Sequence, residues 1–146
     1  MPNANFGAGI AISDDDSTIA IGSPDAHDSS GMVQVHHLVD SKWVRKGGDI
    51  KPPSNIVSFG LRVGLSRDGD SLAIAAPMSD APKSKGVGAL FVYDWDSTAE
   101  TWKDAIVKYG KVDTPKLGLN GITTDPINLL LHAVDENNKK HSFKVR

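Results

Sequence analysis

The sequence repeats itself at a spacing of 53 residues, and this repeat constrains the fold more than any other feature. The segment FGAGIAISDDDSTIAIGSP (residues 6–24) aligns without a gap with FGLRVGLSRDGDSLAIAAP (residues 59–77). Seven of the 19 positions are identical (Phe, Gly, Ser, Asp, Ala, Ile and Pro), and four more are conservative exchanges. Such a repeat indicates one supersecondary unit used more than once, because each unit buries an apolar face against its neighbour.

The similarity continues beyond these two segments. GMVQVH (residues 31–36) parallels GALFVY (residues 88–93), and a weaker third copy follows, in which ITTDPINLLLHA (residues 122–133) aligns with residues 65–76. We therefore predict three repeat units within a single domain over residues 1–146, the third of them truncated. Their approximate bounds are residues 6–58, 59–116 and 117–146.

Each unit has the pattern of short strands. Apolar residues recur at every second position in residues 6–12 and 59–65, which is the period of a strand. Asp68-Gly69 predicts a hairpin, because glycine accepts a positive φ. Pro24 and Pro77 are expected to end the second strands. Of the 18 acidic residues 16 are Asp, and the chain has 14 Gly and 8 Pro, so its composition favours turns over helices.

Four antiparallel strands in a unit of about 53 residues are typical of a β-propeller blade. We therefore predict an all-β fold, a partial β-propeller of about three four-stranded antiparallel blades with the third incomplete. Small residues on the second strands fit a crowded position in such a ring: Ala20, Gly22, Ala73 and Ala75. The alternative is a β-sandwich with small residues at close contacts. Closed propellers hold about four to eight blades, so we expect either a fragment of a larger propeller or a homo-oligomer of this chain.

The repeated segments resemble the FG-GAP repeats of integrin-α-like β-propellers. Phe6-Gly7 and Phe59-Gly60 match the first element of that repeat, and residues 21–24 and 74–77 match its second element imperfectly. The pattern is also similar to repeat arrays of bacterial and algal surface proteins, which Gly48-Asp49-Ile50 matches as well. The resemblance implies a propeller fold, an extracellular or cell-surface location, and a role in adhesion, ligand binding or scaffolding.

Charge and composition exclude several classes of function. The net charge is −2, so no basic field is expected to attract nucleic acid. The chain has no cysteine, which excludes disulfides and thiolate metal sites. Residues 1–11 have neither the basic stretch nor the apolar run of a signal peptide. No apolar run approaches the roughly 20 residues that span a bilayer, so we expect no membrane insertion.

A calcium site in the first loop of each unit is disfavoured, and we expect no metal or other cofactor. The loops carry Asp14–Asp16 and Asp68, but Ile19 and Leu72 replace the acid that would close a calcium-binding loop. Arg67 also places a cation inside the second loop. We therefore predict tight hairpin turns at these positions.

No catalytic motif occurs in the chain, so no catalytic residue is predicted. Trp43 and Trp102 occupy equivalent repeat positions and are expected to be structural, whereas Trp95 has no counterpart. An unrepeated tryptophan in a polar loop after a strand suits stacking on a sugar ring. The basic run Lys139-Lys140-His141 is expected to be a solvated face. The predicted ligand-binding residues are Trp95, Asp94, Asp96 and His27.

These observations lead to a functional expectation. We expect a non-enzymatic binding, adhesion or scaffolding module that contacts a protein or carbohydrate ligand through the loops between strands. A carbohydrate-binding lectin formed by oligomerised propeller blades is the alternative. A catalytic propeller domain ranks third, because no catalytic constellation supports it.

Overall fold

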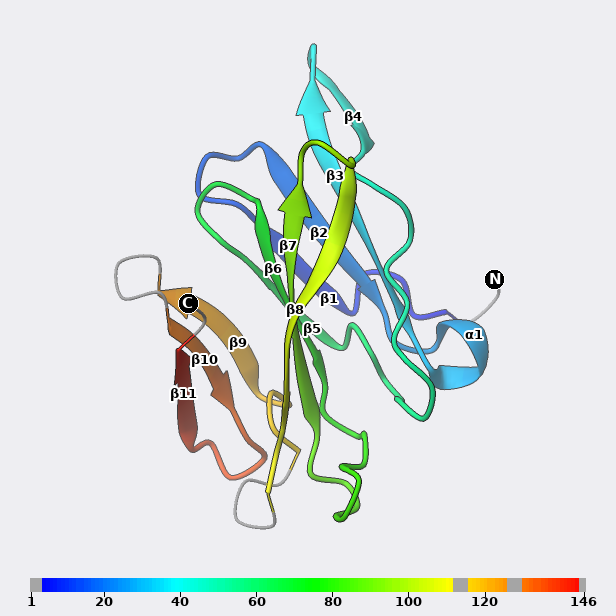
Figure 1. Cartoon of the computed structure of the whole chain (residues 1–146), viewed down its shortest axis with the longest axis vertical. Coiled ribbons are helices and arrows are strands. Elements are labelled where there is room, and N and C mark those ends of the chain that lie inside the picture. Colours follow the sequence, from blue (N-terminus) through cyan, green and yellow to red (C-terminus); the bar gives the residue numbers. More distant parts are fainter. Residues whose placement is uncertain (1–3, 112–115, 126–129, 145–146) are drawn as a thin grey trace.

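The computed structural model describes residues 4–111, 116–125 and 130–144, which form three antiparallel sheets (Figure 1). Blade 1 has the strand order β1-β2-β3-β4, blade 2 the order β5-β6-β7-β8, and blade 3 the order β11-β10-β9. Blade 1 consists of β1 (Gly9–Ile12), β2 (Thr18–Ser23), β3 (Met32–Val39) and β4 (Lys42–Arg45), with the short helix α1 (Ala26–Ser29) between β2 and β3. Blade 2 consists of β5 (Arg62–Leu65), β6 (Ser71–Ala76), β7 (Ala89–Asp96) and β8 (Thr101–Tyr109). Blade 3 consists of β9 (Gly121–Asp125), β10 (Leu130–Val134) and β11 (Lys140–Lys144).

The predicted all-β partial propeller is therefore confirmed. Consecutive strands are neighbours in every sheet, as the alternating patterns and turn residues predicted. The repeat in the sequence is also a repeat in the backbone. The amide of Gly7 donates to the carbonyl of Gly22 at 2.9 Å, and 53 residues later the amide of Gly60 donates to the carbonyl of Ala75 at 3.1 Å.

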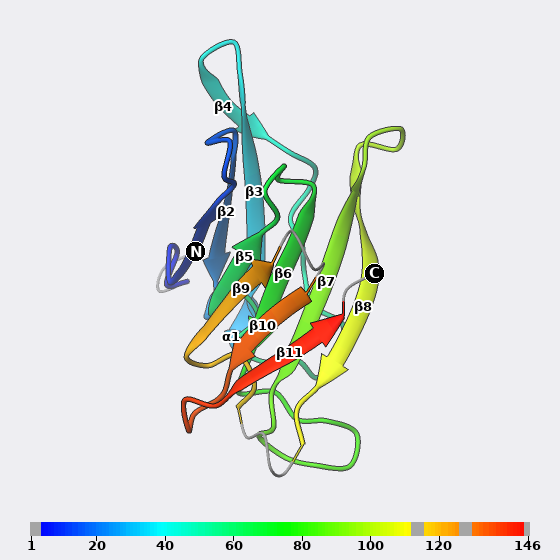
Figure 2. The same ribbon diagram turned by 90° about the vertical axis from the view of Figure 1, so that its left-hand side faces the viewer.

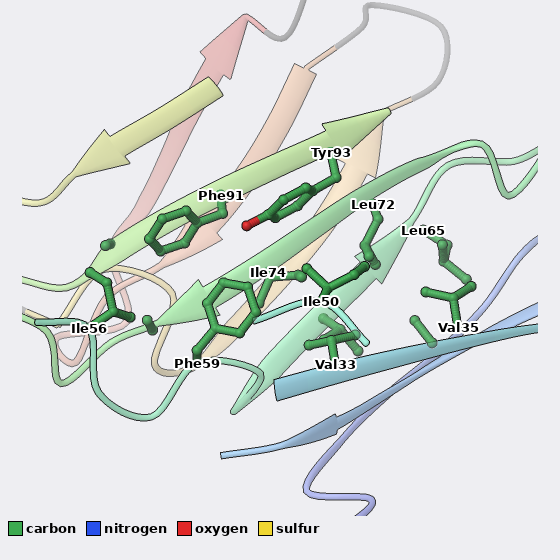
Figure 3. Packing of buried hydrophobic residues seen from close by; sticks show 14 residues of the cluster. Val33, Val35, Ile50, Ile56, Phe59, Leu65, Leu72, Ile74, Phe91 and Tyr93 are labelled. Atoms are coloured by element: carbon green, nitrogen blue, oxygen red, sulfur yellow. The ribbon is translucent and has the colours of Figure 1, made fainter. Parts of the chain in front are cut away.

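The larger part of the core lies between blades 1 and 2, whose sheets stand side by side (Figure 2). At its centre is Phe59, whose ring makes edge contacts with Phe91 (centroids 5.2 Å apart) and Tyr93 (6.4 Å). Figure 3 shows these rings facing the aliphatic side chains of blade 1. The buried cluster comprises Ala20, Val33, Val35, Ile50, Ile56, Phe59, Val63, Leu65, Leu72, Ile74, Ala76, Ala89, Phe91 and Tyr93.

A second, smaller core joins blade 2 to blade 3. Leu117 is buried there and stands at the start of its unit, as Phe59 does in blade 2. The amide of Phe59 donates to the carbonyl of Ser30 in blade 1, and that of Leu117 donates to the carbonyl of Val87 in blade 2. The buried members of this cluster are Ala73, Ala75, Leu90, Val92, Leu117 and Ala133.

The glycines that the repeat places before each third strand allow the blades to approach closely. Gly31 and Gly88 both have a positive φ, of +92° and +82°. A Cβ atom on Gly31 would lie 2.1 Å from the carbonyl oxygen of Phe59, and one on Gly88 would lie 2.6 Å from the amide nitrogen of Leu117. Glycine is therefore required on two grounds, the backbone conformation and the neighbouring blade.

The connections between strands gather at two ends of the sheets (Figure 1). We call the α1 end the one that carries the connections at residues 24–31, 77–88 and 135–139. The hairpin end carries those at residues 13–17, 40–41, 66–70 and 97–100. No helix in the described ranges is long and apolar enough to cross a membrane.

Candidate functional site

One aspartate in each of the first loops, Asp15 and Asp68, accepts hydrogen bonds from its own hairpin. Asp15 accepts hydrogen bonds from the hydroxyl of Ser13 (2.6 Å) and from the hydroxyl and amide of Ser17 (2.7 and 3.0 Å). These bonds, with that from Ser13 the strongest, lower the pKa of Asp15 to about 2. Asp68 repeats the arrangement with Ser66 (2.7 Å), which likewise lowers its pKa. Within the described residues, no three His, Asp or Glu side chains gather closely enough to hold a metal ion.

The predicted ligand-binding residues lie at two opposite ends of the fold (Figure 1). Asp94, Trp95 and Asp96 close strand β7 at the hairpin end of blade 2. His27 lies in α1 at the other end of blade 1. Three of the four residues therefore lie at the hairpin end, and the fourth lies apart from them.

Trp95 lies in a strand rather than in the loop that the sequence suggested. It pairs with Trp102 across β7 and β8, and the two rings are 5.4 Å apart. Both rings face the Nζ atom of Lys46, at 5.3 and 5.4 Å from their centroids. Trp102 was expected to have a structural role, and its Nε1 atom donates a hydrogen bond to the carbonyl of Lys46 at 2.9 Å, which joins the two blades. Trp43, by contrast, is half exposed.

Lys46 connects blade 1 to the hairpin end of blade 2. Its side chain is buried and donates to the carbonyl of Gly69 (2.9 Å) and to the carboxylate of Asp70 (2.5 Å). A buried ammonium group is tolerated only where acceptors and π faces replace water. We call Lys46, Asp70, Trp95 and Trp102 the Lys46 clamp. The ring of Trp95 thus already makes a cation–π contact with a lysine of its own chain.

The two aspartates beside Trp95 also have partners within the blade. Asp94 accepts a hydrogen bond from the hydroxyl of Ser71 at 2.7 Å. Asp96 forms an ion pair with Lys103 and accepts bonds from the amides of Thr98 (2.9 Å) and Ala99 (3.0 Å). The bond from Lys103 is the main cause that lowers the pKa of Asp96 to about 2. Asp94 therefore joins β7 to β6, and Asp96 stabilises the β7–β8 hairpin.

His27 is exposed on a turn with unusual backbone geometry. Its φ is 52°, and that of Asp28 is 56°, so α1 is not regular inside. The hydroxyl of Ser30 donates to the carbonyl of His27 at 2.8 Å and closes the turn. His27 is the member of the predicted set that lies at the α1 end.

A histidine–carboxylate pair at the α1 end of blade 3 was not predicted from the sequence. The Nε2 atom of His141 lies 2.8 Å from the carboxylate of Asp135. Asp135 is fully buried, whereas the side chain of His141 is 14% exposed. His141 is therefore a paired, largely buried group and not part of a solvated basic face.

The surroundings of Asp135 hold it as an anion. The amides of Asn137 (2.9 Å) and Lys139 (3.0 Å) donate to the same carboxylate, and Asn120 donates to the backbone carbonyl of Asp135 (2.9 Å). Burial raises the pKa of Asp135, but the bonds from His141 and from the two amides outweigh it and leave the pKa lowered. A buried carboxylate that holds one nitrogen of a histidine is the arrangement that orients a general base.

The sequence carried only a weak signal for this pair. Asp135 directly follows β10 and His141 lies near the start of β11, so an antiparallel pair of strands with a short turn brings them together. The weak third copy of the repeat made that turn hard to place. Lys46 had no signal at all, because its partners come from residues 23 to 56 positions away.

No family model and no curated protein sequence matches this chain. Among solved structures, the fold is similar to the periplasmic gluconolactonase of Pseudomonas aeruginosa, with a TM-score of 0.63 at 13% sequence identity. The match covers 94% of this chain and 39% of that protein, so the chain spans well under half of its length. The similarity supports a propeller-like fold, and the more specific FG-GAP resemblance stays a prediction.

This match corrects the functional expectation. A non-enzymatic binding or adhesion module, or a lectin of oligomerised blades, was predicted, whereas the matched structure is an enzyme. Sequence motifs are local, whereas the folded chain brings together polar groups that no short motif contains. The matched protein is periplasmic, which places that protein outside the cytoplasm.

Proposed function

We propose that this chain is part of a propeller enzyme that hydrolyses a small polar lactone. Two observations support the proposal, the fold similarity to a gluconolactonase and the Asp135–His141 pair. The second carries it, because it is a property of this chain's own residues. It combines a buried, anionic carboxylate with an imidazole that reaches solvent at the α1 end.

The chemistry of lactone hydrolysis suits such a pair. Water adds to the carbonyl carbon, the ring C–O bond breaks, and a hydroxy acid forms. A base must take a proton from the attacking water, and an acid must return a proton to the leaving oxygen; histidine performs both steps near neutral pH. In this proposal His141 exchanges the proton, while Asp135 orients the ring and stabilises the imidazolium form.

The proposal also places the substrate in the fold. The substrate would bind at the α1 end, beside His141. Action outside the cytoplasm, as in the periplasmic protein of similar fold, belongs to the same proposal.

The test is titration of the acid released from glucono-1,5-lactone, with the spontaneous rate subtracted. We expect release above that rate, and a loss of about 100-fold or more in His141→Gln, the scale that one general base contributes. His132→Gln is the matched control, because His132 lies in the same sheet but pairs with Ser142. Circular dichroism must show that both variants keep the strand content of the parent.

Two results would contradict the proposal. One is a parent chain that releases acid only at the spontaneous rate. The other is His141→Gln turning over as fast as His132→Gln, which would leave the Asp135–His141 pair with a purely structural role.

A further inference from the structure

One face of the sheet of blade 1 is exposed, whereas the equivalent face of blade 2 is buried against blade 1. The residues at the two faces are equivalent, because they lie 53 positions apart in the repeat. The exposed fractions are 60%, 58% and 56% for Phe6, Ile10 and Ile12, against 0%, 7% and 8% for Phe59, Val63 and Leu65. Exposed apolar residues in one patch indicate an interaction surface.

Strand pairing extends this open face across three strands. Ile10 pairs with Ile21, Ile12 pairs with Ile19, and Ile19 in turn pairs with His36. Side chains of paired residues point to the same side of a sheet. We call Phe6, Ile10, Ile12, Ile19, Ile21 and His36 the open face.

His36 adds a polar feature to the open face. Its Nδ1 atom is buried and has no hydrogen-bond partner in the described part of the chain. Burial lowers the pKa of His36, and Arg45 lowers it further. Because atoms of this chain already cover that nitrogen, a docked partner would pack against the apolar side chains of the open face and not bond to the Nδ1 atom.

The interface between blades 1 and 2 shows what kind of surface fits such a face. Blade 1 covers Phe59, Val63 and Leu65 with small and branched apolar side chains. They come from two strands and from the β4–β5 connection: Ala20, Val33, Val35, Ile50 and Ile56. Gly22 allows the closest approach, because a Cβ atom there would lie 1.9 Å from the carbonyl oxygen of Gly60.

The far side of blade 3 does not offer such a surface. His132 pairs there with Ser142, and their side chains are hydrogen-bonded at 2.7 Å. Val134 pairs with Lys140, whose side chain is exposed. In blades 1 and 2 the corresponding strands present Ala and Val instead, as Ala20 and Val35 do. Burying this lysine against isoleucine is costly, so a second copy does not fit head to tail.

We propose that the open face of blade 1 docks a β-propeller blade from outside these 146 residues. That blade presents small and branched apolar side chains, as blade 1 does to blade 2. The inference stands on the packing of the blades and is independent of the proposed hydrolysis.

The test supplies such a blade in the same chain. Residues 1–58 are placed directly before residue 6, so that the join repeats the natural step from Ser58 to Phe59. The added unit then presents its own copies of Ala20, Val33 and Val35 to the open face. The double substitution Ile10→Lys with Ile12→Lys is made in the natural chain. In the extended chain it is made in the original unit, whose open face the added unit covers, and not in the added copy. Val107→Lys, at another exposed apolar residue, is the control in both.

The readout is the urea midpoint of unfolding, with hydrogen exchange to follow the added unit. In the natural chain the double substitution should leave the midpoint unchanged, because both isoleucines are more than half exposed. In the extended chain the double substitution should lower the urea midpoint by about 1 M or more. Val107→Lys should leave the midpoint of both chains unchanged. An equal response of the two chains, or an added unit that stays unfolded, overturns the proposal. Self-association of the natural chain that the double substitution abolishes would also overturn it, because the partner would then be a second copy.

Discussion

The two phenylalanines at equivalent repeat positions allow a direct test of how the blades are held together. Phe59→Ala removes a ring that is fully buried between blades 1 and 2. Truncation of a buried Phe to Ala costs about 3–5 kcal/mol of unfolding free energy. Phe59 also loses its edge contacts with Phe91 and Tyr93, so we expect the upper part of that range. Phe6→Ala removes the same atoms from a residue that is 60% exposed and should cost within about 0.5 kcal/mol.

The assay is urea unfolding followed by tryptophan fluorescence and by far-ultraviolet circular dichroism. With a urea m-value of about 1–3 kcal/mol per M, Phe59→Ala should move the midpoint by about 1.5 M or more. If that variant does not fold, Phe59→Leu gives a milder test, because Leu117 fills the equivalent position of blade 3. It should fold and should still be less stable than Phe6→Leu.

Equal losses for the Phe6 and Phe59 variants would refute this reasoning. Such a result would mean that Phe6 is as well packed in solution as Phe59, or that the contact between blades 1 and 2 contributes little. The urea m-values must agree among the variants, since a changed m-value would mean that the unfolding itself had changed.

Three further predictions follow from the packing and the charges. Lys46→Met removes the cation of the Lys46 clamp and its charged hydrogen bonds, so the chain should lose about 1–3 kcal/mol of stability in urea unfolding. Gly22→Ala should lower the melting temperature sharply because the added Cβ meets the neighbouring backbone, whereas Gly48→Ala, with nothing within 4 Å, should leave it unchanged. The contribution of Asp15 and Asp96 to stability should be constant above about pH 5 and fall as the pH approaches 2, because the lowered pKa values of these two groups mean that folding favours their charged forms. Thermal melts from pH 2 to pH 7 measure this, and a smaller fall in Asp96→Asn would identify the group.

Part of the candidate site could be predicted from the sequence, and part could not. The sequence drew attention to Trp95 because it is unrepeated. In the structure its ring packs against the buried side chain of Lys46 in the Lys46 clamp. The predicted role in ligand binding stays a prediction for Asp94, Trp95, Asp96 and His27. The Asp135–His141 pair was overlooked, because a carboxylate and an imidazole six positions apart become a site only once a turn folds them together.

The sequence by itself determined the repeat, the strands and their order. Those features are local: alternation of apolar residues, glycine in the turns and proline at strand ends act within a few residues of chain. Only the tertiary structure decided which of two equivalent faces is buried. Phe6 and Phe59 stand at equivalent positions of the repeat, yet one is exposed and the other lies in the core. Burial depends on whether a neighbouring blade is present, and the pattern of a single unit contains no information about its neighbour.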